Sequence, residues 1–550
     1  MVLCTRNSII MADETGKVRS LASVAGIVAA ATLISKIFGL VRQQAIAAAF
    51  GVGVAVDAYN YAYVIPGFLL VLLGGINGPF HSAIVSVVAK RDKRDAVPLI
   101  ETMTTLVGGI LLLVTVALVI FAHPLIDLVA PGLSETAAGQ EIREIAVIQF
   151  RIMAPMALLA GLIGIGFGSL NAADMYWLPS ISPLFSSVAL LGGLGVLALS
   201  LGKQIIEPQY AMLGGLVLAW GTLLGALLQW LVQVIVQWRE GLGTLRLRFD
   251  FWRPGVREVL NVMGPATFSS GMMQINVYTD LWFASFIPQT ASALGYAGLL
   301  VQTPLGIISN TLLVPLLPIF SRLAAPEHWD QLKQRIRQGL ILSGLTMLPL
   351  GALMVALATP IVRVVYERYA FDREASEFVA AILMAYGLGM FVYLGRDVIV
   401  RVFYALGDGQ TPFRVSIANI FLNVLLDYFF IQWFGAPGLV LATMGVNVVS
   451  MVVLLWLLNG KIGGLPWLEW ATPIAALTVL SFVTGMAGWG IYVGLQRFLG
   501  DGGFLLSLFQ LTVAGCGGLA VFAMVVARMG LSEVDLFMNR LRGKFGGRRG

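Results

Sequence analysis

The 550-residue chain is poor in charged residues, in histidine and in cysteine. Charged residues make up 12% of it, against about 25% in soluble globular proteins. Hydrophobic residues make up 58%, and the mean hydropathy is +0.87. This composition excludes an ordinary soluble domain and indicates a polytopic membrane protein. The two cysteines, Cys4 and Cys516, are far apart and the three histidines are scattered, so neither a disulfide framework nor a metal cluster is predicted.

Motifs for catalysis are missing as well. No GxxxxGK[ST] phosphate-binding loop occurs, which argues against ATP hydrolysis within the chain. No loop is long and acidic enough for a glycosyltransferase site, since the longest connection, Trp238–Arg257, is rich in arginine. We therefore expect a transporter without a cofactor rather than an enzyme. Residues 1–20 are mixed and polar and show no cleavable signal peptide, so the first span is expected to act as its own insertion signal.

Apolar runs of about 20 residues, the length that crosses roughly 30 Å of hydrocarbon, recur along the chain. They do not alternate polar and apolar residues as spanning β-strands do, so an all-α polytopic fold is predicted. About fourteen transmembrane helices are expected, near residues 22–49, 54–88, 98–122, 142–170, 176–201, 209–238, 256–287, 291–322, 334–358, 376–406, 412–434, 437–459, 469–495 and 504–528.

Lysine and arginine are distributed unevenly over the predicted connections. With the N-terminus in the cytoplasm, 24 of the 35 basic residues fall on the cytoplasmic side and six on the other, with five inside spans. This asymmetry predicts a multi-pass protein of a bacterial inner membrane with both termini cytoplasmic, including a tail over 1–20 and a basic tail over 531–550. The basic clusters favour contact with anionic membrane lipids over a role with nucleic acid.

A weak internal repeat has a period near 236–238 residues. Tyr61–Gly67 resembles Gly298–Gly306, and Phe167–Asp174 resembles Phe403–Asp408. The common offset predicts two six-helix lobes in parallel orientation plus two C-terminal helices. The predicted divisions are an N-lobe at 21–238, a basic linker at 239–255, a C-lobe at 256–460 and the last two helices at 461–530.

Charged residues inside the first two spans are the main functional signal. Lys36, Arg42 and Asp57 lie in nearly uninterrupted apolar sequence, where a charge costs at least roughly 2.5–3.5 kcal/mol. Such charges are tolerated when they face a bundle interior or a wet cavity. A guanidinium suits phosphate oxygens, so Arg42 predicts an anion contact, while an ion pair with Asp57 that merely joins two helices is the structural alternative.

Polar residues also occur in the seventh and tenth predicted spans. Gln274, Asn276 and Asp280 lie in the seventh, with the last two on one helix face at i and i+4. They could line the opposing lobe or form interhelical hydrogen bonds. In the tenth, Asp397 and Arg401 have the spacing of an intrahelical ion pair. The carboxylates at positions 127, 408 and 427 lie near predicted span ends, where we expect them to be solvated.

The second span is dense in helix-breaking residues. Packing explains many glycines and prolines in membrane helices, but this density predicts a helix that bends. The candidate hinge residues are Pro66, Gly74, Gly75 and Gly78.

Several blocks, in order from residue 20 to about 530, resemble the MurJ (MviN) lipid II flippase family of the multidrug/oligosaccharidyl-lipid/polysaccharide exporter superfamily. The opening block is Ser35-Lys36-x2-Gly39-x2-Arg42, followed by Ala49-Phe50-Gly51-x5-Asp57-Ala58-x3-Ala62-x3-Pro66. Later blocks are Met263–Ala266, Gln274-Ile-Asn276, Phe283–Phe286, Thr311–Pro315 and Arg401-x-Phe403-Tyr404-Ala405-x2-Asp408-x2-Thr411-Pro412.

The resemblance implies two six-helix lobes around a cationic cavity, with the last two helices adding a groove for a lipid tail. It implies movement of an undecaprenyl-diphosphate-linked peptidoglycan precursor between leaflets by alternating access, coupled to an ion or to membrane potential rather than to ATP. The cell-wall synthesis machinery would be a possible partner. Lys36 replaces an arginine of better-known members. Three of their cavity arginines are absent, at Leu70, Val71 and Leu299.

The prediction is therefore a flippase for a lipid-linked peptidoglycan precursor, lipid II. The less cationic cavity leaves open an exporter of another polyprenyl-linked glycan or of a small molecule. An interaction scaffold of the envelope machinery is a further alternative.

Overall fold

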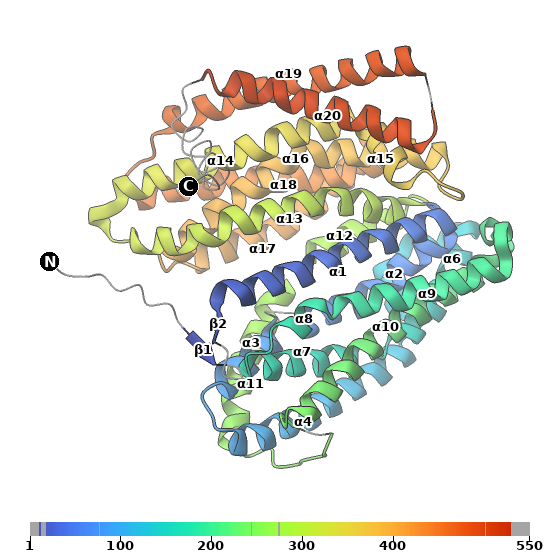
Figure 1. Ribbon diagram of the computed structural model, residues 1–550, viewed down its shortest axis with the longest axis vertical. Helices are drawn as coiled ribbons and strands as arrows, with labels where there is room; N and C mark the ends of the chain where they lie inside the picture. The colour runs from blue at the N-terminus through green and yellow to red at the C-terminus, as the bar shows by residue number, and fades with distance from the viewer. Residues whose placement is uncertain are drawn as a thin grey trace. The chain divides into compact units, whose positions relative to one another are not determined.

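The computed structural model describes residues 10–12, 18–75, 78–243, 245–272, 275–500 and 502–529. The chain divides into two compact units, residues 1–289 and 290–550. Nearly all of the described chain is helical (Figure 1), apart from a small antiparallel pair of β1 (Ile10–Ala12) with β2 (Val18–Ser20).

The first unit contains most of the short helices. Its helices are α1 (Leu21–Phe50), α2 (Val54–Gly74), α3 (Pro79–Val88), α4 (Lys93–Ile120), α5 (Ala122–Val129), η1 (Pro131–Ser134), α6 (Ala137–Met153), α7 (Met156–Ala172), α8 (Trp177–Ile181), α9 (Pro183–Leu201), η2 (Gly202–Ile206), η3 (Pro208–Tyr210), α10 (Ala211–Arg239), α11 (Pro254–Met272) and α12 (Ile275–Ala284). Within this unit α9 packs against both α1 and α10, as Figure 1 shows.

The second unit is built from longer helices. They are α13 (Thr290–Arg322), η4 (Pro326–His328), α14 (Trp329–Ala356), α15 (Ala358–Tyr366), α16 (Arg373–Ala405), α17 (Gln410–Phe434), α18 (Ala436–Lys461), α19 (Trp467–Leu499) and α20 (Phe504–Val526). Glycine ends two of them: Gly435 after α17 has φ +62° and Gly500 after α19 has φ +74°, a conformation that favours glycine. In this unit α19 and α20 pack against each other and on α14.

The repeat predicted from the sequence is visible in the helix bounds. Lys93–Ile120 and Trp329–Ala356 differ by 236 residues at both ends, and α5 and α15 begin 236 residues apart. The caps agree as well. Thr136 accepts a hydrogen bond at the N-terminus of α6, and Asp372, 236 residues later, accepts one at the N-terminus of α16. Both are good N-cap residues.

Twelve stretches of the described chain are long and apolar enough to cross a membrane. The predicted spans at 22–49 and 256–287 are outside that set, although both are helical, as α1 and as α11 with α12. The multi-pass helical fold is confirmed, whereas the count of fourteen stays a prediction. Three further predicted spans, 54–88, 142–170 and 176–201, also divide into two helices each. The interruptions include Gly75 and Gly78, then 154–155, and then 182, where glycine, proline or a residue before proline ends the helix.

The boundary between the two compact units, at residues 289 and 290, differs from the predicted lobe boundary. The helices α11 and α12, predicted as the start of a C-lobe at 256, fall in the first unit, where α11 packs on α3 and α12 on α5. The divisions 21–238, 239–255, 256–460 and 461–530 rest on the repeat and stay predictions. The tail at 531–550 lies outside the described residues.

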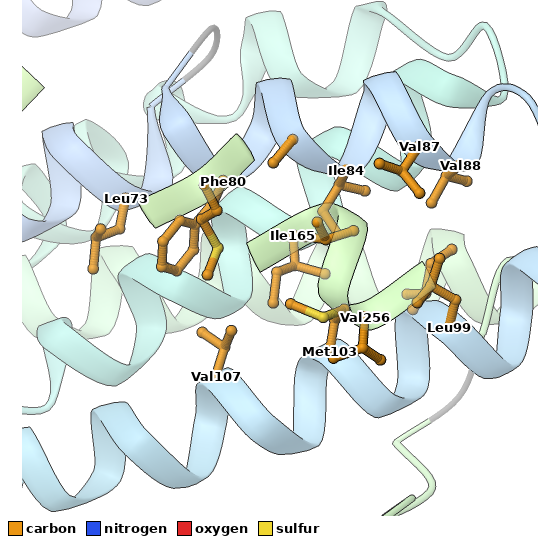
Figure 2. Packing of buried hydrophobic residues seen from close by; sticks show 14 of the residues in the cluster. Leu73, Phe80, Ile84, Val87, Val88, Leu99, Met103, Val107, Ile165 and Val256 are labelled. Atoms are coloured by element: carbon orange, nitrogen blue, oxygen red, sulfur yellow. The ribbon is translucent and has the colours of Figure 1, made fainter. Parts of the chain in front are cut away.

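A hydrophobic core joins α2, α3, α4, α7 and α11 in the first unit. Figure 2 shows its side chains, among them Phe80 and Ile84 of α3, Met103 of α4 and Ile165 of α7. Between these helices small residues allow close approach, since a Cβ atom on Gly164 of α7 would overlap the backbone carbonyl of α2. This packing fixes the ends of α2 and α3 on either side of their interruption.

Candidate functional site

The two cations of the first span lie in different environments. Helix α1 rests on α8 and α9, where the Ser35 hydroxyl lies 3.4 Å from the carbonyl oxygens of Ser180 and Ile181. Lys36 is exposed, whereas Arg42 is half-buried. Arg42 is therefore the cation that the fold partly encloses.

Arg42 lies beside two phenols of α2. Its guanidinium is close enough to Tyr59 and Tyr63 to interact electrostatically with both. Their rings stack with centroids 5.5 Å apart and planes 18° apart. The Nε atom of Arg42 is buried and has no hydrogen-bond partner among the residues that the structure describes. A buried donor left unsatisfied costs about 1–3 kcal/mol, so this arrangement can accept an anionic oxygen.

Asp57 lies in the first turn of α2 with 2% of its surface exposed. A carboxylate in this position is stabilised by the helix dipole, and it also interacts electrostatically with Tyr61. Asp57 is therefore buried at the N-terminus of α2. The ion pair with Arg42 stays a prediction.

The polar residues predicted in the seventh span are described in part. Gln274 and the side chain of Asn276 lie outside the described residues. Asp280 is half-buried on α12, which is fixed by an edge-on contact between Tyr278 and Phe68 of α2 at 5.5 Å. Asp280 therefore belongs to a helix packed within the first unit.

The candidate hinge residues surround the interruption between α2 and α3. Pro66 lies inside a continuous α2, which ends at Gly74. Gly75 and Gly78 have extended backbones with ψ of 146° and 169°. Gly74 has a packing role, because a Cβ atom there would lie 3.0 Å from the carbonyl oxygen of Ala160. The helix is thus interrupted at Gly75 and Gly78 and not at Pro66. The bending motion stays a prediction.

A row of buried glutamines on α10 was missed by the sequence reasoning. Gln229 and Gln233 are buried, and Gln237 follows at the same four-residue spacing. Gln233 donates a hydrogen bond to the Ile163 carbonyl at 2.9 Å, and Gln237 donates to the Ser169 hydroxyl at 2.5 Å. The spacing was the available signal, since it places all three on one face of an apolar helix.

Helix α17 carries a similar row, and here a prediction is wrong. Asn419, Asn423 and Asp427 lie four residues apart and are all buried. Asp427, expected to be solvated near a span end, has 0% of its surface exposed and accepts a hydrogen bond from Asn423. The helix extends to Phe434, so position 427 lies two turns inside it.

The charged residues of α16 pair differently from the i,i+4 prediction. Asp397 lies 3.8 Å from Arg396, its neighbour in sequence. Arg396 also donates to the Ser450 hydroxyl of α18 at 3.0 Å. Arg401 donates to the carbonyl of Leu313 in α13 at 3.0 Å. These arginines join helices within the second unit.

Two carboxylates outside the spanning helices form ion pairs. A hydrogen bond from Arg143 at 2.5 Å lowers the pKa of Asp127. Burial raises the pKa of Asp408, but hydrogen bonds from Lys461 and Thr411 outweigh burial and lower that pKa to about 2. The Asp127 side chain is 45% exposed and is therefore solvated as expected as well as paired, whereas the Asp408 side chain is 18% exposed.

An apolar pocket of about 350 Å³ lies between α14, α16 and α19 in the second unit. Its walls include Met347, Phe391 and Trp489. Two of its glycines, Gly351 and Gly387, let the backbones of α14 and α16 meet, since a Cβ atom on Gly387 would lie 2.9 Å from the Gly351 carbonyl oxygen. The pocket suits an apolar chain rather than a charged group. Among the side chains described, no group of His, Cys, Asp and Glu could hold a metal ion.

Comparison with known proteins identifies the family. The profile described as "Lipid II flippase MurJ" matches residues 46–510. The chain is 58% identical to a probable lipid II flippase MurJ of Synechocystis sp., over 96% of this chain and 98% of that protein. It is 30% identical to the lipid II flippase MurJ of Burkholderia cenocepacia, over 80% of this chain and 83% of that protein.

Solved structures show the same fold. The inward closed conformation of lipid II flippase MurJ superposes with a TM-score of 0.70 at 20% identity, covering 91% of this chain and 99% of that one. An inward-facing multidrug resistance transporter of the MATE family, in the MOP superfamily, superposes with a TM-score of 0.55 at 16% identity, covering 82% and 98%. On its sequence matches, the chain belongs to the lipid II flippase MurJ family.

Proposed function

We propose that this protein is a lipid II flippase, a transporter that moves the undecaprenyl-diphosphate-linked peptidoglycan precursor from the inner to the outer leaflet. The observation that carries this proposal is the 58% identity, over nearly the full length of both chains, to a probable lipid II flippase. The matched relatives carry the lipid II flippase name, so export of another glycan or of a small molecule is not favoured.

Two features of the structure support a cargo with a charged head and an apolar tail. Arg42 offers a buried, unsatisfied N–H to an anionic oxygen, and a guanidinium suits the oxygens of a diphosphate. The apolar pocket beside α19 suits part of a polyprenyl chain. Lys36, Asp57, Gln274, Asn276 and Asp280 are proposed as further cavity residues, and the interruption between α2 and α3 as the hinge of alternating access.

The setting of this activity is proposed from the sequence. The protein would lie in a bacterial inner membrane with both termini in the cytoplasm, in contact with anionic lipids and possible cell-wall synthesis partners. Coupling to an ion or to membrane potential, rather than to ATP, is proposed as well.

The test is rescue of a bacterial strain depleted of its lipid II flippase. Wild type should restore growth, and Arg42→Ala should abolish rescue while the protein still inserts at normal abundance. Arg414→Ala, at the exposed start of α17, is the matched control and should rescue fully. Normal growth with Arg42→Ala would remove Arg42 from the site, and failure of the wild type to rescue would overturn the proposed cargo.

A further inference from the structure

The hydroxyl of Tyr59 has a defined hydrogen-bond direction. It lies 2.9 Å from the Thr222 hydroxyl on α10, and Thr222 in turn donates to the Leu218 carbonyl at 2.7 Å. A threonine hydroxyl has one hydrogen, which is used for Leu218. Tyr59 must therefore donate to Thr222. This hydrogen bond anchors the Tyr59 ring to α10, and the Tyr59 oxygen can then act only as an acceptor toward other groups.

Tyr63, one turn further along α2, is held in a different way. Its ring stacks on Tyr59 and lies over Gly67, where a Cβ atom would come within 2.6 Å of the ring carbon Cζ. The ring is thus positioned from both sides along the helix. Its hydroxyl makes no hydrogen bond within the described part of the chain, and the residue is half-buried. An uncommitted O–H donor therefore lies on α2 within electrostatic range of the Arg42 guanidinium.

We propose that Tyr63 is a second hydrogen-bond donor to the anionic group bound at Arg42, and that Tyr59, anchored by Thr222, is a positioning residue that keeps the Arg42 guanidinium at this place. The inference rests on the proposed function and deepens it. The ligand class is a lipid-linked diphosphate, whose several oxygens can accept from a guanidinium and a phenol at once.

The chemistry supports this division of roles. An O–H donor to a charged oxygen forms a short, strong hydrogen bond, and low local dielectric strengthens it. A phenol has no charge of its own, so it adds a donor without the cost of a second buried cation. Tyr59 cannot act in the same way, because its hydrogen is already committed to Thr222.

The experiment measures binding of undecaprenyl diphosphate and undecaprenyl monophosphate to the purified full-length protein in nanodiscs. Hydrogen bonds to charged groups contribute enough that Tyr63→Phe should weaken diphosphate binding about tenfold. Its effect on the monophosphate, which has fewer oxygens to share, should be smaller. Tyr61→Phe, the same change on the same helix but on a fully buried ring, is the matched control and should bind as wild type does.

The positioning role has its own test. Tyr59→Phe and Thr222→Val should each weaken diphosphate binding a few-fold, and the double variant should lose no more than either single variant, because both break one anchor. Gly67→Ala should displace the Tyr63 ring and reproduce the loss while keeping the hydroxyl. If Tyr63→Phe does not fold, diphosphate binding by Gly67→Ala tests the role of Tyr63 instead.

The outcomes separate this inference from the proposed function. If Arg42→Ala abolishes binding but Tyr63→Phe and Gly67→Ala bind within twofold of wild type, the role of Tyr63 is overturned and the flippase proposal stands. If the losses of diphosphate binding in Tyr59→Phe and Thr222→Val add up in the double variant, the positioning role of the Tyr59–Thr222 hydrogen bond is overturned. If the wild type binds neither lipid, the proposed function fails, and this inference with it.

Discussion

The two halves of the repeat share their spacing but differ in the continuity of their helices. In the first half the chain breaks between α2 and α3 and again between α6 and α7. The equivalent stretches of the second half, α13 and α16, are single helices of 33 residues each. Helix α13 stays continuous although it contains three prolines.

This difference shows that proline alone does not decide where a membrane helix breaks. The break after α2 combines two extended glycines, Gly75 and Gly78, with Pro79 at the start of the next helix. In α13 the prolines at 304, 315 and 318 all lie inside one helix, and none of them starts a new helix after an extended glycine. The first half thus contains the candidate hinge, and the second half contains long, continuous helices.

The largest effect is expected at a position where the halves have opposite charge. Glu101 of α4 is 3% exposed and is paired with Arg248 of the basic linker at 2.5 Å. Its repeat equivalent on α14 is Arg337, which is half-buried and donates a 3.4 Å hydrogen bond to the Glu469 carbonyl. Arg248→Ala should lower the free energy of unfolding by about 2–3 kcal/mol, because it removes a charged partner from a buried carboxylate.

The measurement is unfolding of the purified protein in detergent. Arg246→Ala, in the same linker and exposed, is the control and should change little. Arg337→Ala should cost under about 1 kcal/mol. Equal losses at positions 248 and 337 would contradict the asymmetry between the halves.

A second prediction concerns substitutions that would make the helices of the first half continuous, as those of the second half are. Alanine at Gly75 and Gly78 should favour a continuous helix, because Cβ atoms there would crowd the carbonyls of the last turn of α2 in the broken conformation. With a cost of about 1–3 kcal/mol to the broken state, flipping in proteoliposomes should fall at least about fivefold. Gly192→Ala and Gly195→Ala in α9, where a Cβ atom meets nothing within 4 Å, serve as controls. Full activity of the double variant would show that the break is not needed.

The smallest effect concerns the loops that follow α7 and α16. Asp408 pairs with Lys461 at 2.5 Å, whereas Asp174 in the first half accepts a hydrogen bond from Tyr176 on the surface. The pKa of Asp408 is lowered to about 2 in the folded protein. The contribution of Asp408 to the free energy of unfolding is therefore fully present above about pH 4 and is lost as the pH falls toward 2.

Asp408→Asn should cost about 1 kcal/mol near neutral pH, and the difference from wild type should vanish at the acid end. Thermal unfolding of the two proteins across this pH range measures it. Asp174→Asn should have a smaller effect. A deficit in Asp408→Asn that persists unchanged at pH 2 would contradict the role of the carboxylate.

The sequence predicted the helical class, the repeat period and most span positions, because apolar length and Gly–Pro density are local properties. It singled out Arg42 for the same reason, since a charge in an apolar run is visible without a structure. It did not find Tyr59, Tyr63 and Thr222, because their joint role depends on α2 meeting α10 across 163 residues of sequence. The end of the helix that carries Asp427 was predicted correctly, at Phe434. The prediction for Asp427 was wrong because its burial depends on neighbouring helices, which the local sequence does not show.

The equal spacing of the halves has a consequence for how the chain can change over evolution. The stretch from the start of α4 to the start of α6 has the same length as the stretch from the start of α14 to the start of α16. One residue inserted within a helix would rotate everything after it by about 100° and turn buried faces toward lipid. An insertion within a helix of either stretch is thus expected to be destabilising, whereas a point substitution keeps the register. One copy can therefore have interrupted helices and the other continuous ones while both keep the same register.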